Sequence, residues 1–295
     1  MKRCGKVGLW LFGAVVVGLF GVAWWLDIPS WLAPSPGRID HIYLETSTVP
    51  SGKVEAYVWL PPGYSSRKRY PVMYVLHGWP GNPNDYFQKG RIADTAEKLI
   101  LSGDIQPMLI VAVSGHGPGL LGYGGWVDSW DGKWQLATLV ERDLVQAIDR
   151  LYRTKPSPGD RALMGISEGG YGAVNIAMRH PGVFGLIASH SGHYVASSFR
   201  SSNRVFGTGS VGKAQRSKNS PLMYLALGGT VPRSMPVFMD TTHDDDDYRD
   251  SLAFAKLLKK RGIAYTFTVA TGAHTWRAWR NRFPASLKWV SAGFE

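Results

Sequence analysis

The chain has 295 residues, 44% of which are hydrophobic, and a formal net charge of +11. This length is enough to bury the core of one large domain, and no internal repeat indicates a repeat array. The positive charge suits an anionic membrane surface or cell wall, although a solvated basic surface explains it equally well. A nucleic-acid partner is not expected, because the basic residues are scattered in loops and no binding motif accompanies them.

The first residues predict a membrane anchor. Residues 1–6 form a basic tail, and residues 7–26 are a run of 20 residues without a charge, which is the length that spans a bilayer. The run ends in bulky aromatic residues, whereas a cleaved signal peptide has a shorter apolar region and small residues at its cleavage site. Because basic residues precede the span, we expect a single-pass protein of the cell membrane with its catalytic domain outside the cytoplasm.

A stiff spacer is predicted at residues 27–37, which contain three prolines, and one domain is predicted at residues 38–295. The single cysteine, Cys4, lies on the cytoplasmic side of the predicted span. The domain must therefore be stable without a disulfide.

Three strands are predicted at the start of the domain. Residues 38–48 and 53–60 alternate apolar and polar side chains, as in a half-exposed antiparallel pair, and residues 71–76 form the continuous apolar run of a fully buried strand. Residues 77–79, His-Gly-Trp, follow at once, where a backbone N–H could stabilise the negative oxygen of a tetrahedral intermediate. The alternative is an ordinary glycine-rich turn, and for His77 itself we expect a structural role.

The next segments alternate between helix, strand and loop. Residues 92–101 predict a helix, residues 108–113 a buried strand, and residues 136–152 an amphipathic helix. Residues 114–134 form a long loop rich in Gly and Trp, and long loops are often functional. Its segment 122–128 could line a substrate groove or could cover the core.

Residues 165–169 have the pattern G-x-S-x-G of a nucleophile elbow, in which a serine lies on a sharp turn between a buried strand and a helix. A strand at 161–166 and a helix at 170–180 are predicted on either side. Gly165 and Gly169 are expected for two reasons: a Cβ would strike a neighbouring element, and Gly tolerates the torsion angles of the bend. The hydroxyl of Ser167 is then held out at the carboxyl end of the sheet.

A general base is predicted late in the chain. His274 follows a strand predicted at 265–270, in a turn opened by Gly272. A histidine on such a loop can take the proton of Ser167 and make an otherwise inert hydroxyl nucleophilic. The order Ser, acid, His is the one that α/β-hydrolases use.

Four consecutive aspartates at 244–247 follow a strand predicted at 236–240, and one of them could orient the imidazole. The run could instead form a calcium or zinc site with His243, to which His190 and His193 could add ligands. We expect no metal, because a calcium-loop ladder is absent and a third fixed zinc ligand is missing. No cofactor is expected either.

These motifs resemble the esterase family of the α/β-hydrolase superfamily, which includes S-formylglutathione hydrolases, feruloyl esterases, enterochelin-type esterases and mycolyltransferases. The resemblance extends over residues 39–290 and implies an α/β fold with a mostly parallel central sheet and helices on both faces. Residues 195–231 are rich in Ser and in basic residues. They resemble the variable insertion that shapes the substrate pocket in this fold. The motifs are His77-Gly78-Trp79, Gly165-Ile166-Ser167-Glu168-Gly169-Gly170 and Gly272-Ala273-His274-Thr275-Trp276.

The resemblance also implies roles for individual residues. Ser167 would be the nucleophile and His274 the base, while the backbone N–H groups of Trp79 and Glu168 would form the oxyanion hole. The sequence departs from the family pattern at Trp79, where Leu or Ile is common, and at Ala273, where Gly is common. Neither departure removes a catalytic group, because a backbone amide acts in the first case.

The acid of the triad is expected to be Asp245. Alignment with the family's following helix and glycine places the acid 17 residues before Gly262, which is Asp245. Because insertions of one residue are common in such loops, Asp246 and Asp244 stay open. The remaining aspartates are expected to be solvated and to cap the next helix, whose N-terminus favours negative charge.

The sequence thus predicts a membrane-anchored, extracytoplasmic serine esterase that acts on a small-molecule, lipid or sugar acyl ester through an acyl-enzyme. An acyltransferase that passes the acyl group to a sugar or lipid hydroxyl is the first alternative. A non-catalytic cell-envelope binding protein with the same fold is the alternative of another class. The sequence leaves the acyl and alcohol groups and the oligomeric state open.

Overall fold

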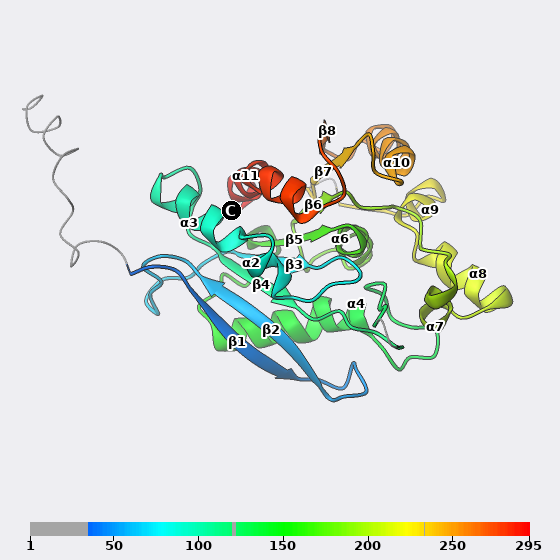
Figure 1. The fold of residues 1–295 in the computed structure, drawn as a ribbon, viewed down its shortest axis with the longest axis horizontal. Helices are drawn as coiled ribbons and strands as arrows, with labels where there is room; N and C mark the ends of the chain where they lie inside the picture. Colours follow the sequence, from blue (N-terminus) through cyan, green and yellow to red (C-terminus); the bar gives the residue numbers. More distant parts are fainter. Residues whose placement is uncertain (1–34, 120–121, 233) are drawn as a thin grey trace, which may run out of the picture. The chain divides into compact units, whose positions relative to one another are not determined.

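Eight strands form the central sheet in the computed structural model, which describes residues 35–119, 122–232 and 234–295. The strands are β1 (Arg38–Glu45), β2 (Lys53–Leu60), β3 (Val72–Leu76), β4 (Leu109–Val113), β5 (Arg161–Ile166), β6 (Leu186–His190), β7 (Val237–Thr242) and β8 (Tyr265–Ala270). Their order across the sheet is β1-β2-β4-β3-β5-β6-β7-β8 (Figure 1). The pairs β1-β2 and β2-β4 are antiparallel, and all later neighbours are parallel.

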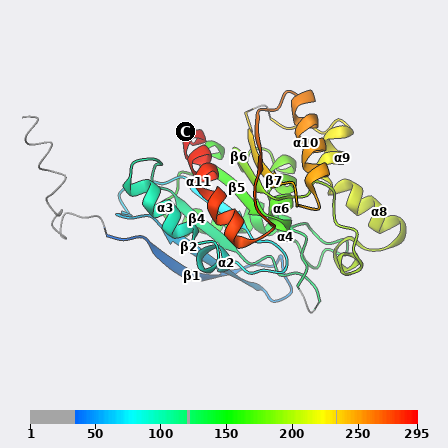
Figure 2. The same cartoon turned by 45° about the horizontal axis from the view of Figure 1, so that its top comes forward.

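Helices cover both faces of this sheet, with α3 and α11 on one face and α5, α6 and α10 on the other (Figures 1 and 2). The α-helices are α2 (Asp85–Gln88), α3 (Ile92–Leu101), α4 (Leu136–Thr138), α5 (Val145–Leu151), α6 (Glu168–Arg179), α7 (Asn203–Phe206), α8 (Gly209–Lys218), α9 (Pro221–Ala226), α10 (Tyr248–Lys260) and α11 (Trp276–Gly293). A π-helical turn (Leu139–Leu144) joins α4 to α5, and short 3-10 turns occupy Pro158–Asp160 and Arg200–Ser202.

Strand β3 shows why the core strands are continuously apolar. Val72, Tyr74 and Leu76 pack into the cluster beneath α5, α6 and α10, whereas Met73 and Val75 pack into the cluster beneath α3 and α11. Because side chains alternate between the two faces and both faces are covered, each of the five residues must be apolar.

The predicted fold class is confirmed as a mostly parallel sheet with helices on both faces. Most predicted strands and helices begin and end within two residues of the observed bounds. Three bounds differ: β1 ends at Glu45 instead of residue 48, α6 begins at Glu168 instead of residue 170, and β7 continues to Thr242, two residues into the expected loop. Strand β6 and helix α11 were not predicted from the sequence.

The predicted membrane span at residues 7–26 lies outside the described residues. Within the described ranges, none of the helices combines the length and the apolar character needed to cross a bilayer.

Candidate active site

Ser167 lies at the turn between β5 and α6. Its backbone has φ 52°, in the left-handed region that non-glycine residues rarely adopt. The turn is fixed by the N–H of Ser167, which donates to the carbonyl of His190 on β6 at 2.9 Å, and by its carbonyl, which accepts from Tyr171 at 3.1 Å. Strain of this kind persists only where the surrounding structure holds it, and it is common at functional sites.

The two elbow glycines are required by space. A Cβ on Gly165 would lie 2.0 Å from the carbonyl oxygen of Gly169, and a Cβ on Gly169 would lie 1.9 Å from the carbonyl oxygen of Leu76. Neither glycine has a left-handed φ. The expectation that they supply unusual torsion angles was therefore wrong, since Ser167 itself carries the unusual φ.

The structure brings Ser167, His274 and Asp245 into one hydrogen-bonded chain. The Nε2 atom of His274 lies 2.8 Å from Ser167 Oγ, and its Nδ1 lies 2.7 Å from Asp245 Oδ1. Because a carboxylate only accepts, Nδ1 carries the imidazole proton and Nε2 is free to accept the serine proton. The ring is held edge-on against Trp279, with centroids 4.9 Å apart.

The Asp245 carboxylate is buried, and both of its oxygens accept hydrogen bonds. Its Oδ2 accepts the N–H of Thr242 at 2.8 Å and the hydroxyl of Thr241 at 3.1 Å, so both oxygens have donors. Burial alone would raise the pKa of this carboxyl, but the hydrogen bonds from His274 and Thr242 hold it well below its usual range. Asp245 is therefore ionised and provides the His274 imidazole with a negatively charged partner.

The other three aspartates have different surroundings. Asp244 and Asp246 are exposed. Asp247 occupies the N-cap position of α10 but forms no side-chain cap, and burial raises the pKa of its carboxyl. The expected solvation thus applies to two of the three.

The two predicted oxyanion-hole residues flank Ser167. Trp79 lines the same pocket of about 320 Å³ as Ser167 and His274. The loop runs close to the nucleophile, since a Cβ on Gly78 would lie 3.2 Å from the Ser167 Cβ. Glu168 is the first residue of α6, where free N–H groups and the helix dipole favour negative charge.

His77 has structural contacts on both ring nitrogens. Its Nε2 accepts the N–H of Gly115 at 3.0 Å, and its Nδ1 lies 2.8 Å from the carbonyl of Gly78. Burial lowers the pKa of His77 to about 4, so the ring is neutral and donates from Nδ1. Loop residues Tyr123 and Trp126 are also buried, which favours covering of the core over a groove lining.

The histidines considered for a metal site lie in separate environments. His190 bonds Asp240 at 2.6 Å, His193 lies 3.0 Å from Glu168, and His243 packs against the Tyr248 ring. In the part of the chain that the structure describes, no group of three or more His, Cys, Asp or Glu side chains could hold a metal ion.

The partners of the Glu168 side chain, Tyr123 and His193, were not predicted from the sequence. A signal was present, because an acidic residue inside a buried elbow requires a cation or hydrogen-bond donors nearby. The partners themselves could not be named, since Tyr123 lies in a long loop and His193 follows the unpredicted strand β6.

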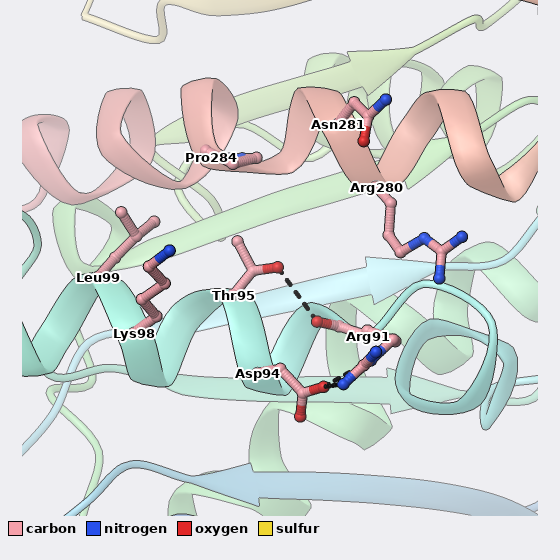
Figure 3. Close-up of a pocket in the computed structure, with 8 residues that line it drawn as sticks. All are labelled: Arg91, Asp94, Thr95, Lys98, Leu99, Arg280, Asn281 and Pro284. Atoms are coloured by element: carbon pink, nitrogen blue, oxygen red, sulfur yellow. Dashed lines mark hydrogen bonds and ion pairs between the residues drawn. The ribbon is translucent and has the colours of Figure 1, made fainter.

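A separate groove of about 470 Å³ lies between α3 and α11 (Figure 3). Its walls include Lys98 and Arg280, and Asp94 is paired with Arg91 at 2.6 Å. The hydroxyl of Thr95 donates to the backbone carbonyl of Arg91, so no base activates it (Figure 3). The candidate active site is therefore the pocket that contains the elbow serine.

Known proteins resemble the chain over most of its domain. The model of the Esterase family matches residues 47–290. An endo-1,4-beta-xylanase/feruloyl esterase of Xylanibacter ruminicola is 30% identical over 155 residues, which cover 48% of this chain and 20% of that protein. An uncharacterized protein of Corynebacterium glutamicum is 23% identical over 245 residues, which cover 80% of this chain and 57% of that protein. The chain thus spans less than two thirds of each relative's length.

The fold has solved counterparts. A ferulic acid esterase superposes with a TM-score of 0.78 at 25% identity, covering 88% of this chain and 100% of that chain. The family match, which extends over most of the chain, agrees with this likeness and with the resemblance seen in the sequence. The chain therefore belongs to the Esterase family, has an α/β-hydrolase-like fold and is related to hydrolases that act on esters.

Proposed function

We propose that the chain is a serine esterase that hydrolyses carboxylic acyl esters through an acyl-enzyme on Ser167. The observation that carries this proposal is the continuous chain of hydrogen bonds from Ser167 through His274 to a buried, ionised Asp245. This geometry matches the roles of nucleophile, general base and orienting acid. A non-catalytic binding protein would have no need for a strained serine aligned with a base.

Acylation begins when Ser167 Oγ attacks the ester carbonyl carbon and its proton passes to His274 Nε2. The carbonyl oxygen becomes negative and is stabilised by the backbone N–H groups of Trp79 and Glu168. Collapse of this intermediate breaks the bond to the alcohol oxygen, which takes the proton from His274. Water then repeats the sequence and releases the carboxylic acid.

The pocket supports an apolar acyl group. Trp79, Pro80, Trp276 and Trp279 contribute its walls, and its volume of about 320 Å³ suits a small aromatic or short aliphatic acyl chain. One relative is named a feruloyl esterase, so hydroxycinnamoyl esters are the first substrates to try. The alcohol half would be a small molecule, a lipid or a sugar.

Acyl transfer is a second candidate for the same site. The side chain of His274 is 42% exposed, which leaves the reacting groups open to an acceptor larger than water. Assays with and without sugar or lipid alcohols distinguish the two outcomes, because transfer yields a new ester where hydrolysis yields the free acid.

We further propose that residues 7–26 anchor the protein in the cell membrane, with the domain outside the cytoplasm. The uncharged length of this segment and the basic residues before it support the proposal.

Turnover of a panel of chromogenic acyl esters by the wild type and by Ser167→Ala tests the esterase function. We expect Ser167→Ala to lose at least about 10⁴-fold in kcat. Ser189→Ala is the matched control, because its buried hydroxyl on β6 bonds Tyr194 and is not part of the site. Equal turnover by wild type and Ser167→Ala would rule out the proposal.

A further inference from the structure

The side chain of Glu168 carries a buried charge beside the proposed oxyanion hole. Its Oε1 accepts the hydroxyl of Tyr123 at 2.8 Å, and its Oε2 lies 3.0 Å from His193 Nε2. Glu168 and His193 are 7% and 9% exposed, so water screens neither charge strongly. The residue that would donate its backbone N–H to a negative oxygen therefore also carries a buried carboxylate.

The neighbours of His193 require its imidazole ring to be protonated. Its Nδ1 lies 2.8 Å from the carbonyl of Val195, and its Nε2 faces the Glu168 carboxylate. Both of these groups only accept hydrogen bonds, so both ring nitrogens must donate. The ring also stacks on Tyr171, with centroids 4.5 Å apart and planes within 11°.

The charged groups around His193 agree with this protonation state. Burial alone would lower its pKa, but Glu168, Asp247 at the start of α10 and the Val195 carbonyl raise it, with a net value of about 9. Burial raises the pKa of Tyr123 and of Tyr171 well above the usual range, so these neighbours are neutral.

Tyr123 links the Glu168 carboxylate to the side chain of Trp79. While its hydroxyl bonds Glu168, its ring lies edge-on against Trp79 with centroids 5.4 Å apart. Phe199 stacks on the same Trp79 ring at 5.2 Å. The Glu168 carboxylate is thus linked, through Tyr123, to the side chain of Trp79, the residue that carries the other proposed donor.

We propose that His193 is a positioning residue that acts through Glu168: its positive charge neutralises the Glu168 carboxylate and holds the oxyanion-hole amide in place. The inference rests on the proposed serine-esterase function. Without the cation, an unpaired carboxylate would repel the negative oxygen of the tetrahedral intermediate and weaken its stabilisation.

A double-mutant cycle of His193→Gln and Glu168→Gln tests this charge pairing. We expect His193→Gln alone to lower kcat about 10-fold near neutral pH, with KM changed less than about 3-fold, because an uncompensated carboxylate acts on the transition state. In the Glu168→Gln background the same His193→Gln change should alter kcat by less than about 3-fold. A merely structural role predicts an equal or larger loss in that background.

The pH profile gives a second readout that does not depend on the folding of a His193 variant. Wild-type kcat should fall as pH rises through about 9, where His193 loses its proton. Glu168→Gln should lack this fall, since a neutral amide can still accept from Tyr123 and can donate to a neutral imidazole. His243→Gln is the matched control, because this exposed histidine lies outside the contact.

Two results would overturn the inference: equal kcat losses for His193→Gln in both backgrounds, or the same alkaline fall in wild type and Glu168→Gln. Either result counts against the inference only if turnover by the wild type depends on Ser167. A wild type without such turnover would instead remove the proposed function.

Discussion

Ser167 and its partners show how single residues set the chemistry. The backbone of Ser167 is held in a left-handed conformation that points its hydroxyl at His274, and His274 is oriented by a carboxylate whose second oxygen is fixed by Thr242 and Thr241. Each group thus has its position set by the next one, and the last of them, Asp245, is buried. Loss of the Asp245 carboxylate should therefore disturb the orientation of His274 and lower the reactivity of Ser167.

Asp245→Asn should lower kcat about 10³- to 10⁴-fold. The amide oxygen must stay with the Thr242 N–H, so the NH₂ group faces His274 Nδ1 and forces the ring proton onto Nε2. An imidazole in that tautomer cannot accept the proton of Ser167. Steady-state kinetics on a chromogenic ester measure the change.

Asp246→Asn is the matched control, because the exposed Asp246 carboxylate is its sequence neighbour. Near-normal turnover by Asp245→Asn, together with a large loss at Asp246, would show that another carboxylate orients the base.

The His193–Glu168 pair should make stability depend on pH. The folded-state pKa of His193, about 9, lies above the ordinary histidine pKa of about 6.5 that applies to the unfolded chain. Its contribution is therefore fully present below pH 6.5 and is lost as pH rises through about 9.

Urea unfolding near pH 6 and pH 10 tests this dependence. Wild type should lose more unfolding free energy than Glu168→Gln over this range, by a margin on the order of 2 kcal/mol. Equal losses in the two proteins would mean that the pair does not titrate as described.

At the scale of elements, the site depends on how closely β3, β5 and α6 approach one another. The elbow brings the first turn of α6 against the end of β3, where Gly169 meets the backbone of Leu76. No side chain fits between them, so the helix and the strand must separate if one is added.

Gly169→Ala should lower the unfolding free energy by more than about 3 kcal/mol, because its Cβ would lie 1.9 Å from a strand carbonyl. Gly52→Ala is the comparison: nothing lies within 4 Å of its Cβ, and φ +66° alone should cost about 1 kcal/mol. Thermal or urea unfolding measures both. A Gly169→Ala protein as stable as Gly52→Ala would contradict the close approach.

Elements with a clear apolar period were predictable, and those whose polar residues are satisfied by tertiary contacts were not. Strand β6 ends in Ser189 and His190, which are fully buried, and His190 is accommodated by Asp240 and Ser286 from distant segments. Helix α11 contains Pro284 and carries basic residues along its length. Neither pattern predicts a core element from local sequence.

The candidate site was accessible to sequence reasoning only where its chemistry is local. The elbow around Ser167 is contiguous, and His274 follows a recognisable strand. Choosing among the four aspartates required knowing which side chain in the turn after β7 is buried. Asp245 is buried, whereas its neighbours Asp244 and Asp246 are exposed. Burial of that kind is set by tertiary packing and has no signature within a run of identical residues.

At the scale of the whole molecule, both ends of the described domain are tied to its surface. The N–H of Gly37 donates to Glu97 on α3 at 3.3 Å, and the N–H of Glu295 donates to the carbonyl of Gly159 at 3.4 Å. The described domain is therefore held at Gly37 against α3 and at Glu295 against the turn before β5.

The full-length protein should remain in the membrane fraction after a carbonate wash, because a 20-residue uncharged segment partitions into the bilayer. Protease added outside intact cells should remove the esterase activity, and a chain that starts at Pro36 should be recovered without membranes. A mature N-terminus near residue 30, with the protein free in the medium, would contradict the anchor.

Mass spectrometry of the full chain, after brief exposure to a slowly hydrolysed acyl ester, detects an acyl-enzyme on Ser167 if one forms. We predict a mass increase equal to one acyl group minus the hydroxyl hydrogen that it replaces, located on the peptide that contains Ser167 and absent from Ser167→Ala. An acyl group on another residue, or ester turnover that persists in folded Ser167→Ala, would contradict it.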